Sequence, residues 1–377
     1  MKRILISFFS IILALLVCVH CPLTNALAPS VSGGGIILMD ANSKHIFYEK
    51  DIHKKRPMAS TTKIMTVLLT IESGNLEREI TFTRNMIAED SNMGLKVGDK
   101  VSLYSLCVGM MLSSGNDAAN AAAISVGGNI ENFCKLMNQK AKDLGMKNTS
   151  FETPSGLDGE HHYSTSYDMA LLAIYAMKND TFKKLASAKS MKISFGTPKR
   201  ECTYYNHNKL LSSYKGAVGV KTGFTKKSGR CLVSMAERDG ASLVCVTLNT
   251  GDDWNVHKKL FDFGFEQFTD FEAGKDISLS TLPLVGGEKC TVDILIEEKI
   301  IKIPKDLVEK VKLSVQVEPF VYAPTYKGDV VGEYFYHFEG REIFRGMIYL
   351  NEDITLKPCN PVKLFFERLF YSFRRML

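Results

Sequence analysis

The spacing of hydrophobic residues changes along the chain, and each spacing predicts a different kind of element. After Gly33-Gly34-Gly35, the stretch GIILMDANSKHIFYEK holds two apolar runs around a polar turn, which predicts a β-hairpin. Residues 61–71 are apolar on nearly every side and Gly74 follows them, which predicts a buried helix just after Ser60. Further helical patterns begin near Ser102, after Asp117, at Ile130 and at Ser166.

Strand-like patterns return in the second half of the chain. The runs GAVGVKT, RCLVSMAE and ASLVCVTLN are separated by glycine-containing turns, and a helical pattern follows from Asp253 to Phe268. An early hairpin, a central helical block and three late strands predict an α+β fold, in which helices cover one antiparallel sheet. Short strands with frequent glycine and proline then predict a small all-β domain. The predicted domains are residues 29–270 and 271–355.

The first 28 residues have the layout of a secretory signal. Lys2 and Arg3 precede an apolar run from Ile4 to Val19, and the small-residue sequence Ala26-Leu27-Ala28 follows. An uncleaved membrane anchor is the alternative, but the run is short for a membrane span and Ala-x-Ala is a typical cleavage site. We therefore expect the mature chain to begin at Pro29, outside the cytoplasmic membrane.

Residues 356–377 predict an amphipathic helix. In PVKLFFERLFYSFRRML, apolar residues recur at helical spacing, and basic residues fall mostly between them. The segment is too polar to span a membrane, but aromatic residues on one face and arginines on the other suit the membrane interface. A terminal helix packed on its own domain is the alternative. The position at the extreme end of an exported chain favours peripheral attachment to the membrane.

Composition and charge narrow the class of protein. The chain has 377 residues, of which 45% are hydrophobic and 23% charged, which is typical of a globular protein of about two domains. Lys2 and Arg3 contribute two units of the net charge of +6, and residues 357–377 contribute four. The body between them is near neutral, which argues against a general nucleic-acid surface.

Cysteines and histidines offer no metal-binding pattern. An odd, scattered set of cysteines, mostly within apolar stretches, indicates buried thiols rather than disulfides or a zinc site. The pair His161-His162 has no further ligand at metal-binding spacing, so we expect neither a metal nor a cofactor. The cysteines outside the signal are Cys107, Cys134, Cys202, Cys231, Cys245, Cys290 and Cys359.

Candidate chemistry begins with Ser60 and Lys63 in the sequence RPMASTTKIMTVLL. Residues three apart share one face of a helix, so the amine can reach the hydroxyl. Burial and the helix N-terminus both disfavour the charged amine, and a neutral lysine can act as the base for a serine nucleophile. Alone, the pattern is better explained as a polar helix start with a lysine that reaches for solvent.

Two further polar motifs lie at the ends of predicted elements. Ser114-Gly115-Asn116 falls between two predicted helices, where an ordinary turn with Asp117 as a helix cap would explain it. Lys221-Thr222-Gly223 ends a predicted strand, where a cation and a hydroxyl suit a carboxylate ligand and the glycine permits close approach of another backbone. A solvated strand end is the alternative for this motif.

Together, Ser-x-x-Lys, Ser-x-Asn and Lys-Thr-Gly form the signature set of penicillin-recognising serine acyltransferases. From about residue 30 to its end, the chain resembles the low-molecular-mass penicillin-binding proteins, specifically the D-alanyl-D-alanine carboxypeptidases. The segment NTSFETPSGLDGEHHYSTSYDMA adds to the resemblance. It implies a β-lactamase/transpeptidase-like catalytic domain that acts on peptidoglycan stem peptides and binds β-lactam antibiotics covalently.

The resemblance also implies a role for each motif residue. Ser60 would attack the carbonyl between two terminal D-alanines and form an acyl-enzyme, and Lys63 would take its proton. Ser114 would pass a proton to the leaving amine, while Asn116 would position the motif. The motif Lys221-Thr222-Gly223 would bind the substrate, with Lys221 and Thr222 on its terminal carboxylate.

The resemblance further implies an oxyanion hole made of backbone N–H groups, one from the nucleophile and one near Phe224 or Thr225. Phe224 stands where members of the family often have tyrosine, and Ser228-Gly229 replaces a common Ala-Gly. Neither side chain is assigned chemistry. We expect His162 and Asp168 to shape the rim and a helix start rather than to react.

Two other functions share part of these features. A serine β-lactamase has the same three motifs, but Glu152 and Glu160 do not form the Glu-x-x-Leu-Asn arrangement of class A enzymes. The β domain and tail also favour a peptidase that works on polymeric wall. A catalytically idle wall-binding protein is the second alternative, and the intact set of polar motifs argues against it.

Overall fold

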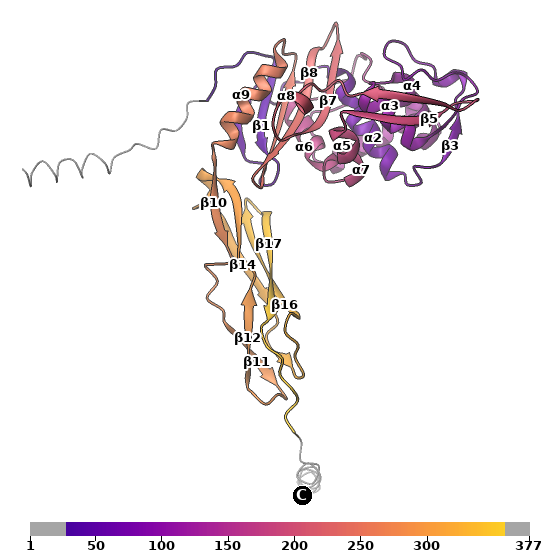
Figure 1. Cartoon of the computed structure of the whole chain (residues 1–377). Coiled ribbons are helices and arrows are strands. Elements are labelled where there is room, and N and C mark those ends of the chain that lie inside the picture. The colour runs from indigo at the N-terminus through magenta and orange to yellow at the C-terminus, as the bar shows by residue number, and fades with distance from the viewer. Residues whose placement is uncertain (1–27, 359–377) are drawn as a thin grey trace, which may run out of the picture.

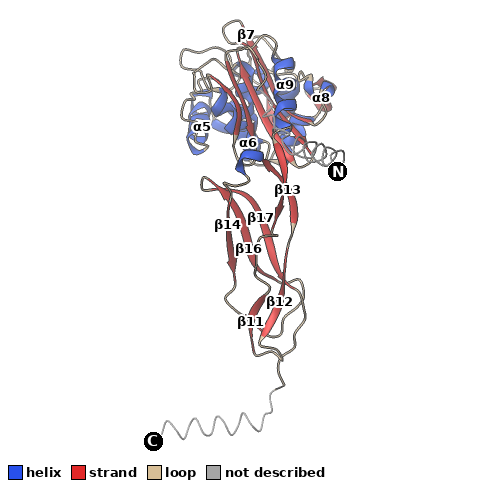
Figure 2. Cartoon of the chain, turned by 90° about the vertical axis from the view of Figure 1, so that its left-hand side faces the viewer, coloured by secondary structure: helices blue, strands red, loops and turns tan. Residues whose placement is uncertain are grey.

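The computed structural model describes residues 28–358 (Figure 1). The predicted secretory signal and amphipathic helix therefore lie almost entirely outside the described residues. Helices surround a sheet in the first part of the chain, and the second part consists of long strands (Figure 2). This arrangement confirms the predicted α+β fold followed by a small all-β domain.

A five-stranded antiparallel sheet forms the centre of the first part, in the order β2-β1-β9-β8-β7. Its strands come from both ends of the domain sequence, as predicted, because the early strand β1 pairs with the late strand β9 over six residue pairs. The strands are β1 (Gly35–Asp40), β2 (Ile46–Lys50), β7 (Ala217–Thr225), β8 (Gly229–Arg238) and β9 (Ala241–Leu248).

Successive side chains of the central strands point to opposite faces of the sheet, and a hydrophobic core lies on each face. In β1, Ile37 joins the larger core while Ile36 and Leu38 join the smaller one. The smaller core is covered by α8 (Leu210–Ser213) and α9 (Asp253–Phe265). Because both faces are covered, β1 is buried along its whole length, and its sequence is apolar until its final aspartate.

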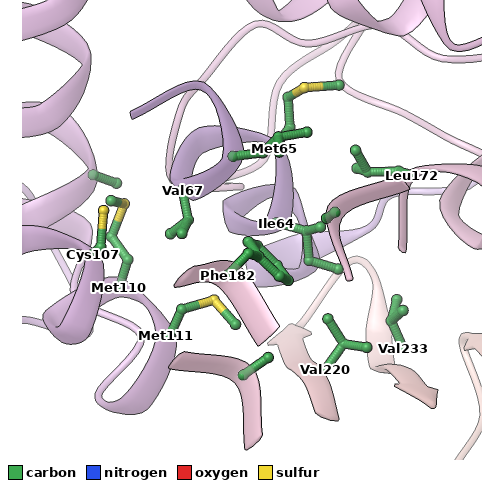
Figure 3. Packing of buried hydrophobic residues seen from close by; sticks show 14 of the residues in the cluster. Ile64, Met65, Val67, Cys107, Met110, Met111, Leu172, Phe182, Val220 and Val233 are labelled. Carbon is green, nitrogen blue, oxygen red and sulfur yellow. The ribbon is translucent and has the colours of Figure 1, made fainter. Parts of the chain in front are cut away.

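The larger core packs the remaining helices against the other face. Helix α2 lies in the middle of it, and seven of its ten residues besides Lys63 are buried, which explains why its sequence is apolar on nearly every side (Figure 3). The helices are α2 (Lys63–Glu72), α3 (Leu103–Leu112), α4 (Asn116–Gly127), α5 (Ile130–Asp143), α6 (Ser166–Ala176) and α7 (Asp180–Ser187).

Several short elements of the first part were not predicted. Two small antiparallel pairs are absent from the predicted set because their strands are short or largely exposed, so the hydrophobic pattern is weak. The pairs are β3 (Glu79–Thr81) with β4 (Lys100–Ser102) and β5 (Ser190–Phe195) with β6 (Arg200–Tyr205). The remaining short helical turns are η1 (Ala59–Thr62) and η2 (Arg84–Met86).

The second part has its own hydrophobic core, which includes Tyr334, Tyr336 and Ile348. Its main sheet has six strands in the order β14-β16-β17-β12-β11-β15, and β10 pairs separately with β13. The elements are β10 (Phe268–Ala273), β11 (Thr281–Val285), β12 (Thr291–Ile296), β13 (Lys299–Pro304), η3 (Lys305–Leu307), β14 (Lys312–Val317), β15 (Val321–Tyr322), β16 (Val330–Phe338) and β17 (Arg341–Leu350).

The two parts meet where α9 passes into β10. Phe47 of β2 contacts Phe268, with ring centroids 5.3 Å apart, and His45 Nε2 lies 3.3 Å from a carboxylate oxygen of Asp306. Strand β10 covers positions 268–273, so the division predicted between residues 270 and 271 falls inside a strand.

Candidate active site

The fold brings the three polar motifs together although they are far apart in sequence. Ser60 lies in η1 at the entrance to α2, Ser114 lies in the turn between α3 and α4, and Thr222 lies on β7. All three line one hollow of about 340 Å³ beside β7, the edge strand of the central sheet. The site is therefore built where two helix starts meet an edge strand.

Ser60 follows a residue with unusual backbone geometry. Ala59 has φ of 48°, in the left-handed region that a residue with a side chain adopts only at a cost. The turn leaves Ser60 partly exposed between buried neighbours, and its Oγ lies 3.0 Å from Lys63 Nζ. The backbone thus presents the hydroxyl to the hollow while the lysine lies behind it.

Lys63 is buried without a carboxylate partner in hydrogen-bond contact. Its side chain is 0% exposed, and Nζ lies 2.6 Å from Asn116 Oδ1 and 2.6 Å from the backbone oxygen of Ser155. Burial, with the positive charge of Lys221 nearby, holds the pKa of Lys63 well below its ordinary value. A neutral amine can donate its two hydrogens to the two carbonyl oxygens and direct its lone pair at Ser60.

The turn that carries Asn116 is fixed on both sides. Ser114 has φ of 59°, and the backbone N–H of Asn116 donates to the oxygen of Ser91. The amide Nδ2 of Asn116 donates to the oxygen of Glu89, so its Oδ1 must face Lys63. Asp117, which the sequence suggested as a helix cap, instead accepts three backbone N–H bonds from residues 93–95.

Lys221 is the second buried amine of the site. Its Nζ donates to Ser114 Oγ at 3.1 Å and to the backbone oxygen of Thr222 at 3.0 Å. Burial lowers the pKa of Lys221 to about 7. Within the described chain, no carboxylate contacts the amine of Lys221 directly. An anionic ligand in the hollow would therefore supply the missing negative charge and favour the ammonium form of Lys221.

Gly223 permits the close approach of β7 to the nucleophile. A Cβ at this position would lie 3.0 Å from the backbone nitrogen of Ser60 and 3.0 Å from the oxygen of Met58. Of the two positions predicted for the second oxyanion donor, the N–H of Thr225 already donates to Ser228 Oγ at 2.9 Å. Phe224 remains as the candidate, and its side chain is exposed at the rim.

Ser155 and Gly156 contribute to the site but were not among the predicted residues. The oxygen of Ser155 contacts Lys63, and Gly156, with φ of 88°, packs so closely that a Cβ would lie 2.0 Å from the oxygen of Ala59. Both residues lie in the segment NTSFETPSGLDGEHHYSTSYDMA, which is part of the family resemblance seen in the sequence. A backbone oxygen, however, cannot be chosen from side-chain chemistry.

His162 braces this segment against the nucleophile turn. Its Nδ1 accepts the backbone N–H of Glu152, so Nε2 carries the hydrogen and donates to Thr62 Oγ1 at 2.8 Å. Burial lowers the pKa of His162 to about 4, so the ring is neutral at neutral pH. Asp168 accepts bonds from the N–H of Asn148 and the hydroxyl of Thr149 and contacts none of the motif side chains.

The hollow is also lined by a guanidinium that was not predicted. The guanidinium of Arg230, at the start of β8, donates to Asp253 Oδ1 at 2.7 Å and lies against the ring of Trp254. All three residues line the hollow, together with His207 and Lys209. Single residues outside short motifs carry no sequence pattern that would mark them as lining a site.

Four of the described cysteines are buried as predicted, but the expectation is wrong for Cys290, which is exposed. Cys290 lies just before β12, in the connection that follows Gly286-Gly287, where the chain is too short to cover it. Cys202 is partly exposed on the edge hairpin β5–β6. Within residues 28–358, no cluster of three or more histidine, cysteine or acidic side chains could hold a metal ion.

Comparisons with known proteins agree with this geometry. The family model described as D-alanyl-D-alanine carboxypeptidase matches residues 23–252, and that of the penicillin-binding protein 5 C-terminal domain matches residues 265–356. The chain is 34% identical over 346 residues to D-alanyl-D-alanine carboxypeptidase DacC of Escherichia coli, covering 87% of this chain and 85% of the relative. It is 29% identical over 330 residues to DacF of Bacillus subtilis, covering 84% and 85%.

Solved structures extend the similarity to both parts of the chain. Penicillin-binding protein 5 of Haemophilus influenzae is 29% identical and superposes with a TM-score of 0.62 over 87% of this chain and 98% of that structure. The carboxypeptidase DacD of Francisella tularensis is 26% identical, with a TM-score of 0.62 over 88% and 95%. With the three motifs gathered around one hollow, the chain belongs to the D-alanyl-D-alanine carboxypeptidase family.

Proposed function

We propose that this enzyme removes the terminal D-alanine from peptidoglycan stem peptides through an acyl-enzyme on Ser60. The observation that carries the proposal is the buried amine of Lys63, held between two carbonyl oxygens and 3.0 Å from the Ser60 hydroxyl. Burial lowers the pKa of this lysine and so favours the neutral amine, which takes the serine proton as Oγ attacks the peptide carbonyl.

The tetrahedral intermediate places its negative charge between two backbone N–H groups. The N–H of Ser60 and that of Phe224 are the proposed donors, since β7 runs past the nucleophile at Gly223 and the N–H of Thr225 is already occupied. The C–N bond then breaks. The leaving amine of D-alanine takes, through Ser114, the proton that Lys63 removed from Ser60, so Lys63 is neutral again before water enters. The Ser114 hydroxyl lies 3.1 Å from Lys221 Nζ.

Recognition of the substrate depends on its free carboxylate. Lys221 and Thr222 are the proposed ligands, and Arg230 adds positive charge to the same hollow, partly offset by Asp253. Water then attacks the acyl carbonyl, with a proton passed back to Lys63, and the shortened peptide leaves. The same set accounts for binding of β-lactam antibiotics, whose carboxylate and strained amide occupy these positions.

Mass spectrometry of the purified chain tests the nucleophile and the reaction together. Incubation with a pentapeptide should release D-alanine, and incubation with penicillin should add the mass of the antibiotic to the peptide that contains Ser60. The Ser60→Ala variant should show neither reaction. Undiminished release of D-alanine by this variant would overturn the mechanism.

The lifetime of the penicillin adduct separates this function from that of a serine β-lactamase. A peptidase should keep the antibiotic bound to Ser60 for many turnovers of peptide, whereas a β-lactamase would hydrolyse a chromogenic penicillin rapidly. Failure of both reactions in a folded protein would instead support the idle wall-binding alternative.

We propose further that residues 1–28 direct export and that the tail over residues 356–377, of which 359–377 lie outside the described residues, attaches the enzyme peripherally to the outer side of the cytoplasmic membrane. The described residues hold no helix suited to crossing a membrane. Flotation of the mature chain with phosphatidylglycerol-containing vesicles tests the attachment. Phe366→Asp combined with Phe370→Asp should release the protein without changing D-alanine release from a soluble peptide.

A further inference from the structure

The end of the β domain that is farthest from the active site carries a group of exposed hydrophobic side chains. Tyr322 is 67% exposed, Tyr326 61% and Leu356 58%. Val285 and Phe320 are also more than two-fifths exposed. We call these five residues the distal patch. Figures 1 and 2 show that the β11–β12 end, where they lie, points away from the helices.

Strand pairing and ring packing bring four of the five residues of the distal patch together, while Tyr326 lies in the connection between β15 and β16. Tyr322 of β15 is opposite Val285 of β11, and both point away from the core that Leu284 enters. Phe320 and Tyr322 pack edge to face, with ring centroids 5.3 Å apart. Leu356 comes alongside through a bridge between its backbone and Gly287.

The chain itself suggests what covers the distal patch. Two residues after Leu356, the described chain ends at Pro358 and continues into the segment that we propose binds the membrane. That attachment holds the patch next to a bilayer surface. Tyrosine and phenylalanine partition favourably into this interface, because their rings are apolar and the tyrosine hydroxyl can remain hydrated.

We propose that the distal patch inserts into the bilayer interface, as a second membrane contact beside residues 359–377. This inference rests on the proposed membrane attachment, not on the proposed catalysis. A paired dimer fits less well, because β15 is the edge strand and has only two residues to offer a second sheet.

Charge near the patch predicts how the contact responds to lipid composition. The connections around the patch hold three lysines and five carboxylates, those of Lys289, Lys327 and Lys357 and of Glu288, Glu318, Asp329, Glu352 and Asp353. Because these groups leave no excess of positive charge, the contact is apolar rather than electrostatic. Insertion of the patch, once the chain is bound, should therefore depend little on the fraction of anionic lipid, unlike attachment of the basic tail.

A fluorescent reporter tests insertion directly, because the chain contains a single tryptophan. The variant Trp254→Phe with Tyr322→Trp places the only indole in the distal patch. The matched control, Trp254→Phe with Tyr205→Trp, places it at a tyrosine of the catalytic part that is equally exposed. With vesicles, the first indole should shift its emission to shorter wavelength and be quenched by brominated lipid, while the control should not change.

A binding measurement gives the second arm of the test. Phe320→Ser with Tyr322→Ser should weaken vesicle binding roughly tenfold, whereas Ile87→Ser with Tyr205→Ser should leave it unchanged. Binding with no response from the indole at position 322 would overturn the patch contact and leave tail attachment intact. If no variant binds vesicles although each still releases D-alanine, both the patch contact and the tail attachment are overturned. A lipid-free dimer abolished by the serine pair would assign the patch to self-association and also overturn the inference.

Discussion

Replacing Asn116 by aspartate offers the sharpest test of the neutral lysine. Asn116 Oδ1 lies 2.6 Å from Lys63 Nζ and accepts one of its hydrogens. Asn116→Asp keeps the size of the side chain and the acceptor oxygen, but it removes the donor to the oxygen of Glu89 and adds a negative charge beside the buried amine. The ammonium form of Lys63 would then be stabilised, and the proposed base would already hold a proton.

The expected effect follows from Coulomb's law. Opposite unit charges about 4 Å apart attract by about 4 kcal/mol at an effective dielectric constant of about 20. That energy corresponds to about three units in the pKa of Lys63. We therefore expect acylation at neutral pH to slow by at least about 100-fold, and part of the rate to return in alkaline solution.

Asn116→Ala separates charge from geometry. Like the aspartate variant, it removes the donor to the oxygen of Glu89; it also removes the acceptor that faces Lys63, and it adds no charge. Loss of a buried hydrogen bond of this kind costs about 1–3 kcal/mol, or roughly 10-fold to 100-fold in rate. The pH at which acylation begins should move upward in the aspartate variant but not in the alanine variant.

The assay is the second-order rate of labelling by a fluorescent penicillin, measured from about pH 5 to about pH 10. Thermal unfolding of each variant checks that the fold persists. If the labelling rate of the aspartate variant rises at the same pH as that of the natural chain, the reasoning that Lys63 acts as a neutral base is refuted. An equal shift in both variants would show that position 116 acts through packing instead.

Further predictions concern the other amine and the turn that supports Ser60. Since the pKa of Lys221 is about 7, kcat/KM for a pentapeptide should fall above that pH as the ammonium is lost, and Lys221→Arg should abolish this fall. Gly156→Ala should lower the melting temperature by several degrees, because its Cβ would meet the oxygen of Ala59; an unchanged melting curve would contradict the packing. The folded pKa of His162, about 4, lies below the ordinary 6.5, so the stability from the neutral ring is present above pH 6.5 and is lost as the pH falls toward 4. Denaturant unfolding at pH 7 and 5 should show that His162→Gln loses about 2 kcal/mol less than the natural chain on acidification.

The sequence predicted those parts of the structure that depend on periodic burial. The five central strands and the buried helix α2 have hydrophobic patterns that strand or helix spacing alone explains. The edge pair β5–β6 was missed because its side chains face solvent about as often as the core. That strands from the two ends of the domain share one antiparallel sheet was also predicted, whereas their order, β2-β1-β9-β8-β7, was not.

Motif chemistry identified the side chains of the candidate site, but not the groups that hold them. Lys63, Asn116 and Lys221 were named because the three motifs together resemble those of penicillin-recognising serine acyltransferases. The oxygen of Ser155 belongs to the backbone, and Arg230 enters the hollow only because β8 begins beside β7. Such contacts arise from tertiary packing, which a linear pattern does not record.

The pairing of β1 with β9 also sets when the enzyme becomes reactive during its synthesis. Strand β1 cannot complete its pairing until Leu248 has been made, and the lysine on β7 reaches Ser114 only within the same sheet. Such distant partners postpone closure of the domain to the end of its translation. A nascent chain shorter than this therefore carries an inert hydroxyl at position 60, and termination before Leu248 yields a polypeptide that antibiotic cannot label.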